Sequence, residues 1–163
     1  MTIIIRKMTR KDMKQVQDIA KTTWHATYDG IIPRDIQNNF LDKAYSLQMM
    51  KQRLKQPYFF VAEVKGKVVG FSQFTVPDQQ GMTELVAIYL YPDYQGIGIG
   101  SAFLKEGMKH LKDVKEIQLN VEKDNHIGRQ FYEAKGFSVI SEYQEDFAGH
   151  VLNTMRMALK MGR

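Results

Sequence analysis

The sequence of 163 residues contains no cysteine, which excludes a disulfide framework, a thiolate metal site and a cysteine nucleophile. It also has no apolar run that approaches the length of a membrane span. The opening Ile3–Ile5 is followed at once by Arg6 and Lys7, so it is too short and wrongly flanked for a signal peptide. Four scattered histidines give no metal-ligand spacing. We therefore expect a cytoplasmic protein with no membrane partner and no metal.

Linkers, internal repeats and low-complexity tracts are also lacking, so nothing marks a boundary between domains. The length suits one domain with a sizeable core. A content of 44% hydrophobic and 25% charged residues is typical of a globular protein. We expect residues 1–163 to form a single domain.

Basic residues outnumber acidic ones by 23 to 18, which gives a net charge of +5 and suits a polyanionic partner. The basic residues are scattered along the expected helices, and no aromatic and basic RNA-binding motif is present. A small ligand with several phosphate groups accounts for the excess as well as nucleic acid does. A basic nucleic-acid-binding domain is therefore the weaker hypothesis, and we expect no nucleic-acid partner.

Hydrophobic periodicity predicts helices early in the chain and strands after residue 58. A capping-box pattern at Thr9-x-x-Asp12 predicts a helix that runs to about Tyr28. Helices between central strands, with hairpins at the ends, predict an α/β (α+β) fold with a mixed sheet flanked by helices. The expected strands are 3–5, 58–64, 67–76, 82–91, 116–121, 137–143 and 151–159, and the later expected helices begin near 33, 47, 99 and 127.

The most informative stretch is the glycine-rich turn of residues 91–101. It lies between the apolar run Leu85–Tyr91, which predicts a buried strand, and an amphipathic run that predicts a helix. A helix start offers unpaired N–H groups and a partial positive charge. Gly96, Gly98 and Gly100 remove side chains that would keep an anion from those amides. The turn is therefore predicted to bind phosphate, although it matches neither a Walker loop nor a dinucleotide fingerprint.

The motif Gln95-x-x-Gly98-x-Gly100 resembles the Gln/Arg-x-x-Gly-x-Gly/Ala signature of the GNAT acetyltransferase superfamily. Leu119–Asn125 and Phe131–Phe137 resemble the next strand and helix of that family, with its Asn and Phe-Tyr…Gly-Phe landmarks. The resemblance is strongest over residues 58–140. It implies a single-domain GNAT fold whose strands are splayed at the acetyl-CoA site, and an N-acetyltransferase with acetyl-CoA as cosubstrate.

The resemblance also assigns the expected contacts with acetyl-CoA. Amides of the turn would hold the pyrophosphate, and main-chain groups around Leu90 would pair with the pantetheine as with an added strand. Asn125 contacts CoA in the family, and from its position it could equally cap the following helix. The full set of expected acetyl-CoA-binding residues is Ile88, Leu90, Gln95, Gly96, Ile97, Gly98, Ile99, Gly100, Ser101, Asn125 and Tyr132.

Acetyl transfer from a thioester to an amine requires a neutral amine and a proton for the departing thiol. At pH 7 an alkylammonium with a pKa of about 10.4 loses its proton at a cost of roughly 4 kcal/mol, so a base or a water chain is expected. The resemblance places Tyr132 beside the sulfur, and an ordinary phenol is acidic enough to protonate a thiolate. Several family members place a carboxylate where Glu84 lies, and it acts through water. For Tyr132 the alternative is a core aromatic residue, and for Glu84 it is a solvated charge at the strand edge. His25 is a rival candidate for the base.

The acceptor side has fewer signals. Trp24-x-x-Thr27-Tyr28 looks like a segment of a bacterial branch that includes spermidine/spermine acetyltransferases, and Trp24 and Tyr28 would share one helix face. We expect a small primary amine as acceptor, a polyamine among the candidates, bound by Trp24, His25, Tyr28 and Glu84. Core packing is the alternative for the two aromatic residues. A protein N-terminus or lysine as acceptor and a non-catalytic acyl-CoA-binding module remain alternatives, and the final strands could pair across a homodimer.

Overall fold

The computed structural model describes residues 1–162 and contains one mixed seven-stranded sheet with the strand order β1-β2-β3-β4-β5-β7-β6. This confirms the expected α/β class. In the described part no helix is long and apolar enough to cross a membrane. The elements are β1 (Ile3–Lys7), α1 (Met13–Tyr28), α2 (Arg34–Ala44), α3 (Leu47–Leu54), β2 (Phe59–Val64), β3 (Lys67–Phe74), β4 (Met82–Leu90), α4 (Ile99–His110), β5 (Glu116–Glu122), α5 (His126–Ala134), β6 (Ser138–Phe147) and β7 (His150–Lys160).

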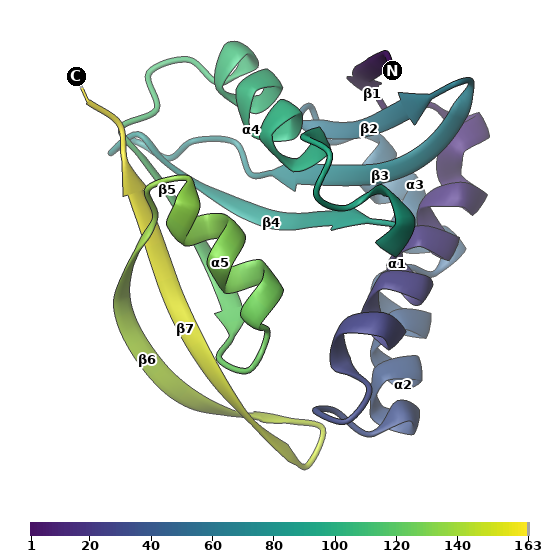
Figure 1. Ribbon diagram of the computed structural model, residues 1–163, viewed down its shortest axis with the longest axis vertical. Helices are drawn as coiled ribbons and strands as arrows, with labels where there is room; N and C mark the ends of the chain where they lie inside the picture. The colour runs from purple at the N-terminus through teal and green to yellow at the C-terminus, as the bar shows by residue number, and fades with distance from the viewer. Residues whose placement is uncertain (163) are drawn as a thin grey trace.

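Helices cover both faces of the sheet (Figure 1). Side chains alternate along a strand, so the central strands contribute to two separate apolar clusters. Val61 packs with Ile19 of α1, whereas Phe60 packs with Phe103 of α4. We call these the α1 face and the α4 face of the sheet. Because both faces are covered, β2 and β3 read as nearly continuous apolar runs.

The parallel strands β4 and β5 pair only over three positions, from Met82↔Glu116 to Glu84↔Gln118, and then diverge (Figure 1). The expected splaying of strands is therefore present. A register shift between β3 and β4 leaves Val86 as an extra residue, and Val86 is 43% exposed. The expectation of a continuously buried strand over Leu85–Tyr91 was wrong at Val86, because the bulge turns this side chain out of the core.

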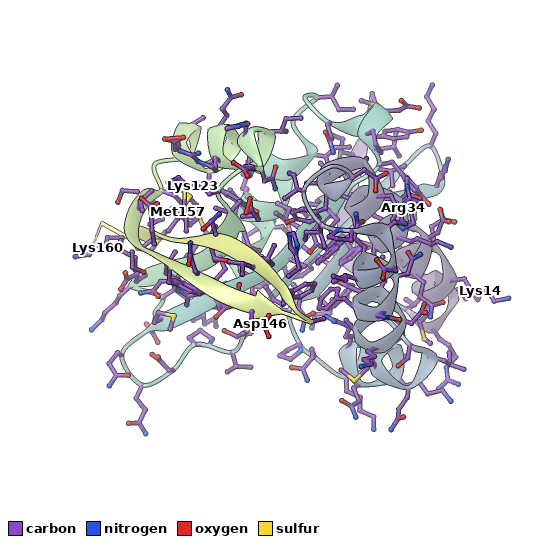
Figure 2. The ribbon with its side chains drawn as sticks, turned by 90° about the horizontal axis from the view of Figure 1, so that it is seen from below. Lys14, Arg34, Lys123, Asp146, Met157 and Lys160 are labelled. Atoms are coloured by element: carbon purple, nitrogen blue, oxygen red, sulfur yellow. The ribbon has the colours of Figure 1, made fainter. Side chains whose placement is uncertain are left out.

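The β6–β7 hairpin extends from the end of the sheet toward the helices on the α1 face. Figure 2 shows it from below, with Lys160 at one end and Asp146 near the turn at the other. Phe147 at this turn stacks on Trp24 of α1 with ring centroids 6.1 Å apart and contacts Phe40 of α2 at 5.3 Å. The hairpin turn therefore packs against α1 and α2, of which α1 lines the cleft between β4 and β5.

The expected capping box closes a short 3-10 turn, Arg10–Asp12, that leads directly into α1. The Asp12 carboxylate accepts hydrogen bonds from the Thr9 main-chain N–H at 2.8 Å and from Arg6 Nη1 at 2.8 Å. Asp12 is only 6% exposed. Burial by itself would raise the pKa of Asp12, but the hydrogen bonds from Arg6 and Thr9 outweigh it and hold the pKa below its ordinary value.

We expect Asp12→Asn to lower the free energy of unfolding by about 2 kcal/mol at pH 7, because it removes a cap and an ion-pair partner. A depressed folded-state pKa stabilises the protein above the unfolded-state pKa of about 3.9, and this contribution is lost as the pH falls through the folded-state value. The difference from wild type should therefore shrink in urea unfolding at pH 3. Asp42→Asn, at an exposed position of α2, is the control and should change little. Equal losses in both variants would contradict the assignment.

Candidate active site

A cleft of about 910 Å³ lies where β4 and β5 separate. Its lining comes from α1, β4, the glycine-rich turn, the end of β5 and α5. A second hollow of about 590 Å³ lies between residues 29–34 and His150 and includes none of the expected acetyl-CoA residues. Within residues 1–162, no three His, Asp or Glu side chains gather as a metal site would require. The larger cleft is therefore the candidate active site.

The glycine-rich turn presents main-chain N–H groups to this cleft. Gly98 is the N-cap of α4 with φ of 95° and has no side-chain cap, and Gly96 has φ of 77°. These positive φ values favour glycine, and a Cβ at either position would meet no atom within 4 Å. The amides of Ile99 and Ser101, in the first turn of α4, have no acceptor within the helix. The space in front of Gly96 and Gly98 and the uncapped amides fit a diphosphate.

Gly100 has a different role from its two neighbours. A Cβ at Gly100 would lie 2.8 Å from Cζ of Phe131, so the missing side chain allows α4 and α5 to pack closely. Ile99 is fully buried and anchors the start of α4, whereas the Ile97 side chain is exposed. Neither side chain lines the cleft, so both residues can contribute only main-chain groups.

The edge of β4 that faces the split is open for pairing. The Tyr91 N–H donates to the Val69 carbonyl of β3 at 3.0 Å, so by alternation the main-chain groups of Ile88 and Leu90 point toward the side that β5 has left. The Leu90 carbonyl accepts from Thr23 Oγ1 at 3.2 Å and from Gln95 Nε2 at 3.3 Å. Side chains of α1 and the turn thus hold the end of β4, and an extended ligand can lie along its edge.

Asn125 and Tyr132 reach the cleft from α5. The Asn125 side chain caps this helix by accepting the Gly128 N–H at 3.0 Å, and it also lines the cleft. The Tyr132 ring lies edge-on to Phe131 and Phe137, with centroids 5.4 Å and 5.7 Å away. Burial raises the pKa of Tyr132 above its ordinary value, and the neighbouring Tyr89 adds to the increase. The phenol is therefore neutral and able to donate, but it is a weaker acid than the sequence alone suggests.

Glu84 lies beside the cleft at the last paired position of β4, opposite Gln118. Its carboxylate accepts a hydrogen bond from Arg156 Nη2 at 3.3 Å. Glu84 does not itself line the cleft, although its neighbours Leu85 and Val86 do. The candidate base is thus adjacent to the split between the strands and not inside the cavity.

The expected acceptor residues separate into two groups. Trp24 and Tyr28 line the cleft with ring centroids 4.7 Å apart, and Trp24 also stacks on Phe40 at 4.5 Å. Trp24 is nearly buried, so most of its side chain packs in the core, as the alternative interpretation expects. The structure does not bring His25 to the cleft, because its Nε2 meets Asn38 Oδ1 at 2.8 Å on the α2 side.

Some residues at the site carry no motif. Thr23 and Asn120 line the cleft, and Arg156 binds Asn120 Oδ1 at 3.1 Å. The alternation of buried and polar residues along the strands could have indicated Asn120 and Arg156. Asn120 stands between Leu119 and Val121, and Arg156 stands between two buried methionines. Polar residues at alternate positions of buried strands indicate one face that is not simply core.

Comparisons with known proteins agree with this geometry. The model of the acetyltransferase (GNAT) family matches residues 14–137. The spermidine N(1)-acetyltransferase of Thermoplasma acidophilum is 27% identical over 155 residues, which cover 90% of this chain and 95% of that enzyme. The solved structure of the PaiA N-acetyltransferase of T. acidophilum with coenzyme A has a TM-score of 0.84 and 27% identity, and the match covers 99% of this chain and 100% of that one. A GCN5-related N-acetyltransferase from Rhodopseudomonas palustris, 18% identical with a TM-score of 0.82, covers 99% and 97% and is similar in fold.

Proposed function

This chain belongs to the GNAT acetyltransferase family and is an acetyl-CoA-dependent N-acetyltransferase, and from that premise we propose that its acceptor is a small primary amine of the polyamine class. The observation that carries the proposal is the cleft at the divergence of β4 and β5. Its lining combines the phosphate-binding amides of the glycine-rich turn with the aromatic side chains of Trp24 and Tyr28 and the carboxylate of Asp124.

The donor would bind along two main-chain surfaces. The uncapped amides after Gly98 would hold the pyrophosphate, with Gly96 and Gly98 leaving room for it. On the open edge of β4, the main-chain groups of Ile88 and the Leu90 N–H would pair with the pantetheine amides. Bound in this way, the cosubstrate supplies an activated acetyl group as a thioester. Asn125 and Tyr132 line the path toward the acetyl end.

Catalysis would use one group on each side of the reacting centre. Glu84 would receive the proton of the amine through a water molecule, since its carboxylate lies next to the cleft and not within it. The neutral amine nitrogen then attacks the thioester carbonyl carbon, and the C–S bond breaks with its electron pair passing to sulfur. The remaining excess proton on the nitrogen passes to solvent, and the thiolate takes a proton from solvent to leave as the free thiol of CoA. The neutral Tyr132 phenol would donate a hydrogen bond to the sulfur as negative charge develops there. No covalent intermediate on the protein is required.

The acceptor end of the cleft suits a compact cationic amine. Tyr28 lines it, and the ring of Trp24 lies tilted against the ring of Tyr28. Burial raises the pKa of Tyr28, Tyr89 and Tyr132 add to the increase, and the carboxylate of Glu122 adds less. Aromatic faces and carboxylates both favour an ammonium group over a neutral ligand. The Thermoplasma relative named for spermidine acetylation supports the same acceptor class.

Packing of the hairpin turn favours a small acceptor over a protein chain. Phe147 lies against Trp24 and Phe40, so the β6–β7 turn covers the aromatic cluster from the side. A protein N-terminus or lysine would need an open groove for an extended peptide at this place. A protein acetyltransferase is therefore the second candidate.

The test is a thiol-release assay with acetyl-CoA against polyamines, amino acids, aminoglycosides and short peptides. We expect turnover with spermidine and spermine at kcat/KM at least about tenfold above that of any peptide, which is a difference of about 1.4 kcal/mol. Mass spectrometry of the product should show one added acetyl group on the amine. Activity confined to peptides would overturn the acceptor assignment, and no thiol release with any amine would overturn the enzymatic role.

A further inference from the structure

Three polar side chains converge on Arg156 at the point where β4 and β5 part. Its Nε donates to Gln118 Oε1 at 3.0 Å, its Nη1 to Asn120 Oδ1 at 3.1 Å and its Nη2 to Glu84 Oε1 at 3.3 Å. All three guanidinium nitrogens are thus engaged, and the Arg156 side chain is 17% exposed. An arginine fork with this many fixed partners holds one geometry.

This hydrogen-bond network lies where the main-chain pairing of β4 and β5 ends. Main-chain pairing between β4 and β5 ends at Glu84↔Gln118, so beyond this pair nothing in the backbone fixes the distance between the strands. Arg156 comes from β7, the neighbour of β5, and its side chain reaches across β5 to β4. It joins the two strands by side-chain bonds at the place where their backbone bonds stop.

The contact between Arg156 and Glu84 involves only one of the two carboxylate oxygens. Arg156 binds only the Oε1 atom, and the Glu84 side chain keeps 36% of its surface exposed. Among residues 1–162, Arg156 is the one cation within ion-pair distance of this carboxylate. One oxygen is therefore held in place while the other remains accessible to solvent, which is what a base acting through water requires.

We propose that Arg156 is a positioning residue for the acetyl transfer, which acts by holding the Glu84 carboxylate at the fork between β4 and β5. This inference rests on the proposed role of Glu84 as base. Asn120, which binds Arg156 and lines the cleft, connects the network to the acceptor. Arg156 itself lies outside the cleft lining and would not touch acetyl-CoA.

A double-mutant cycle between Glu84 and Arg156 tests the proposal, with a polyamine as acceptor. Arg156→Gln should lower kcat about 30-fold and leave KM for acetyl-CoA unchanged, because the phosphate-binding turn is remote from the fork. Arg156→Lys keeps the charge but loses the fork to Gln118 and Asn120, so it should recover part of the loss. In a Glu84→Gln background neither Arg156 substitution should lower kcat further, since the group that Arg156 positions is already gone.

Two outcomes would overturn the inference without touching the proposed function. The first is that the effects of Glu84→Gln and of the Arg156 variants on kcat multiply in the double variants. The second is that Arg156→Gln raises KM for acetyl-CoA and leaves kcat unchanged. If Arg156→Gln does not fold, as thermal unfolding would show, the same cycle is run with Arg156→Lys, for which an approximately fivefold loss of kcat is expected. A wild-type protein that acetylates no amine would instead refute the proposed function itself.

Discussion

Replacing both Gly96 and Gly98 by alanine should weaken acetyl-CoA binding about 100-fold, measured by isothermal titration calorimetry. A Cβ at either position projects into open space, so the added methyl groups occupy the volume that a diphosphate would fill. Hydrogen bonds from amides to a charged phosphate contribute about 1.5 to 3 kcal/mol each. The loss of about one such hydrogen bond corresponds to the expected 100-fold decrease in affinity for acetyl-CoA, which is about 2.7 kcal/mol.

The control for this variant is a second pair of glycines with similar backbone strain. Gly66 has φ of 77°, as Gly96 has, and Gly149 has φ of 85°, near the 95° of Gly98. A Cβ at Gly66 or Gly149 also meets no atom within 4 Å, and both lie in hairpin turns. Alanine at both should cost similar stability, about 1–2 kcal/mol per site, and leave acetyl-CoA affinity unchanged. Equal affinity in the two double variants would show that the turn does not hold the pyrophosphate.

Much of the fold follows from local signals in the sequence. The Lys65-Gly66 turn has positive φ at both residues, so its chemistry directly determines a tight hairpin between β2 and β3. The capping box at Thr9 and Asp12 gives the start of the first helix, and Gly136, with φ of 97°, follows the last one. Such signals depend on residues close in sequence, and their structural consequences are therefore predictable.

The bulge at Val86 and the direction of His25 illustrate what local patterns do not determine. The apolar run around Val86 looks like a continuous buried strand, but pairing with β3 shifts by one residue there. That shift depends on how β4 pairs with β3, which the apolar run itself does not specify. His25 lies on the same helix as Trp24, yet its ring pairs with Asn38 of α2 and does not line the cleft.

The candidate site was predictable to the extent that it is made of main chain. The glycine pattern indicates exposed amides at Gly96 and Gly98 without any knowledge of tertiary contacts. The reason for Gly100 is different, since only the packing of α4 on Phe131 of α5 explains it. The contacts of Arg156 are harder still to predict from the sequence, because they join three strands through side chains.

Tyr132→Phe should lower kcat about 100-fold while the affinity for acetyl-CoA stays within about twofold of wild type. The phenyl ring keeps its packing against Phe131 and Phe137, so the cleft retains its shape. Only the proposed hydrogen bond to the departing sulfur would be lost, and a bond to a charged group contributes about 1.5 to 3 kcal/mol. Thiol release and calorimetric binding of acetyl-CoA, measured on the same preparation, separate the two effects.

The acidity of Tyr132 determines how this loss should be interpreted. Burial raises the pKa of Tyr132 further above that of a thiol, which is ordinarily about 8.5, so complete proton transfer to the thiolate is uphill. In the proposed mechanism the phenol would therefore act by donating a hydrogen bond as the C–S bond breaks, and its ionisation should produce no fall in kcat below about pH 10. Tyr58→Phe is the control, because Tyr58 packs on the α4 face, outside the glycine-rich turn, and does not line the cleft. Unchanged turnover in Tyr132→Phe would remove Tyr132 from the mechanism, and a matching loss of acetyl-CoA binding would reduce its role to packing.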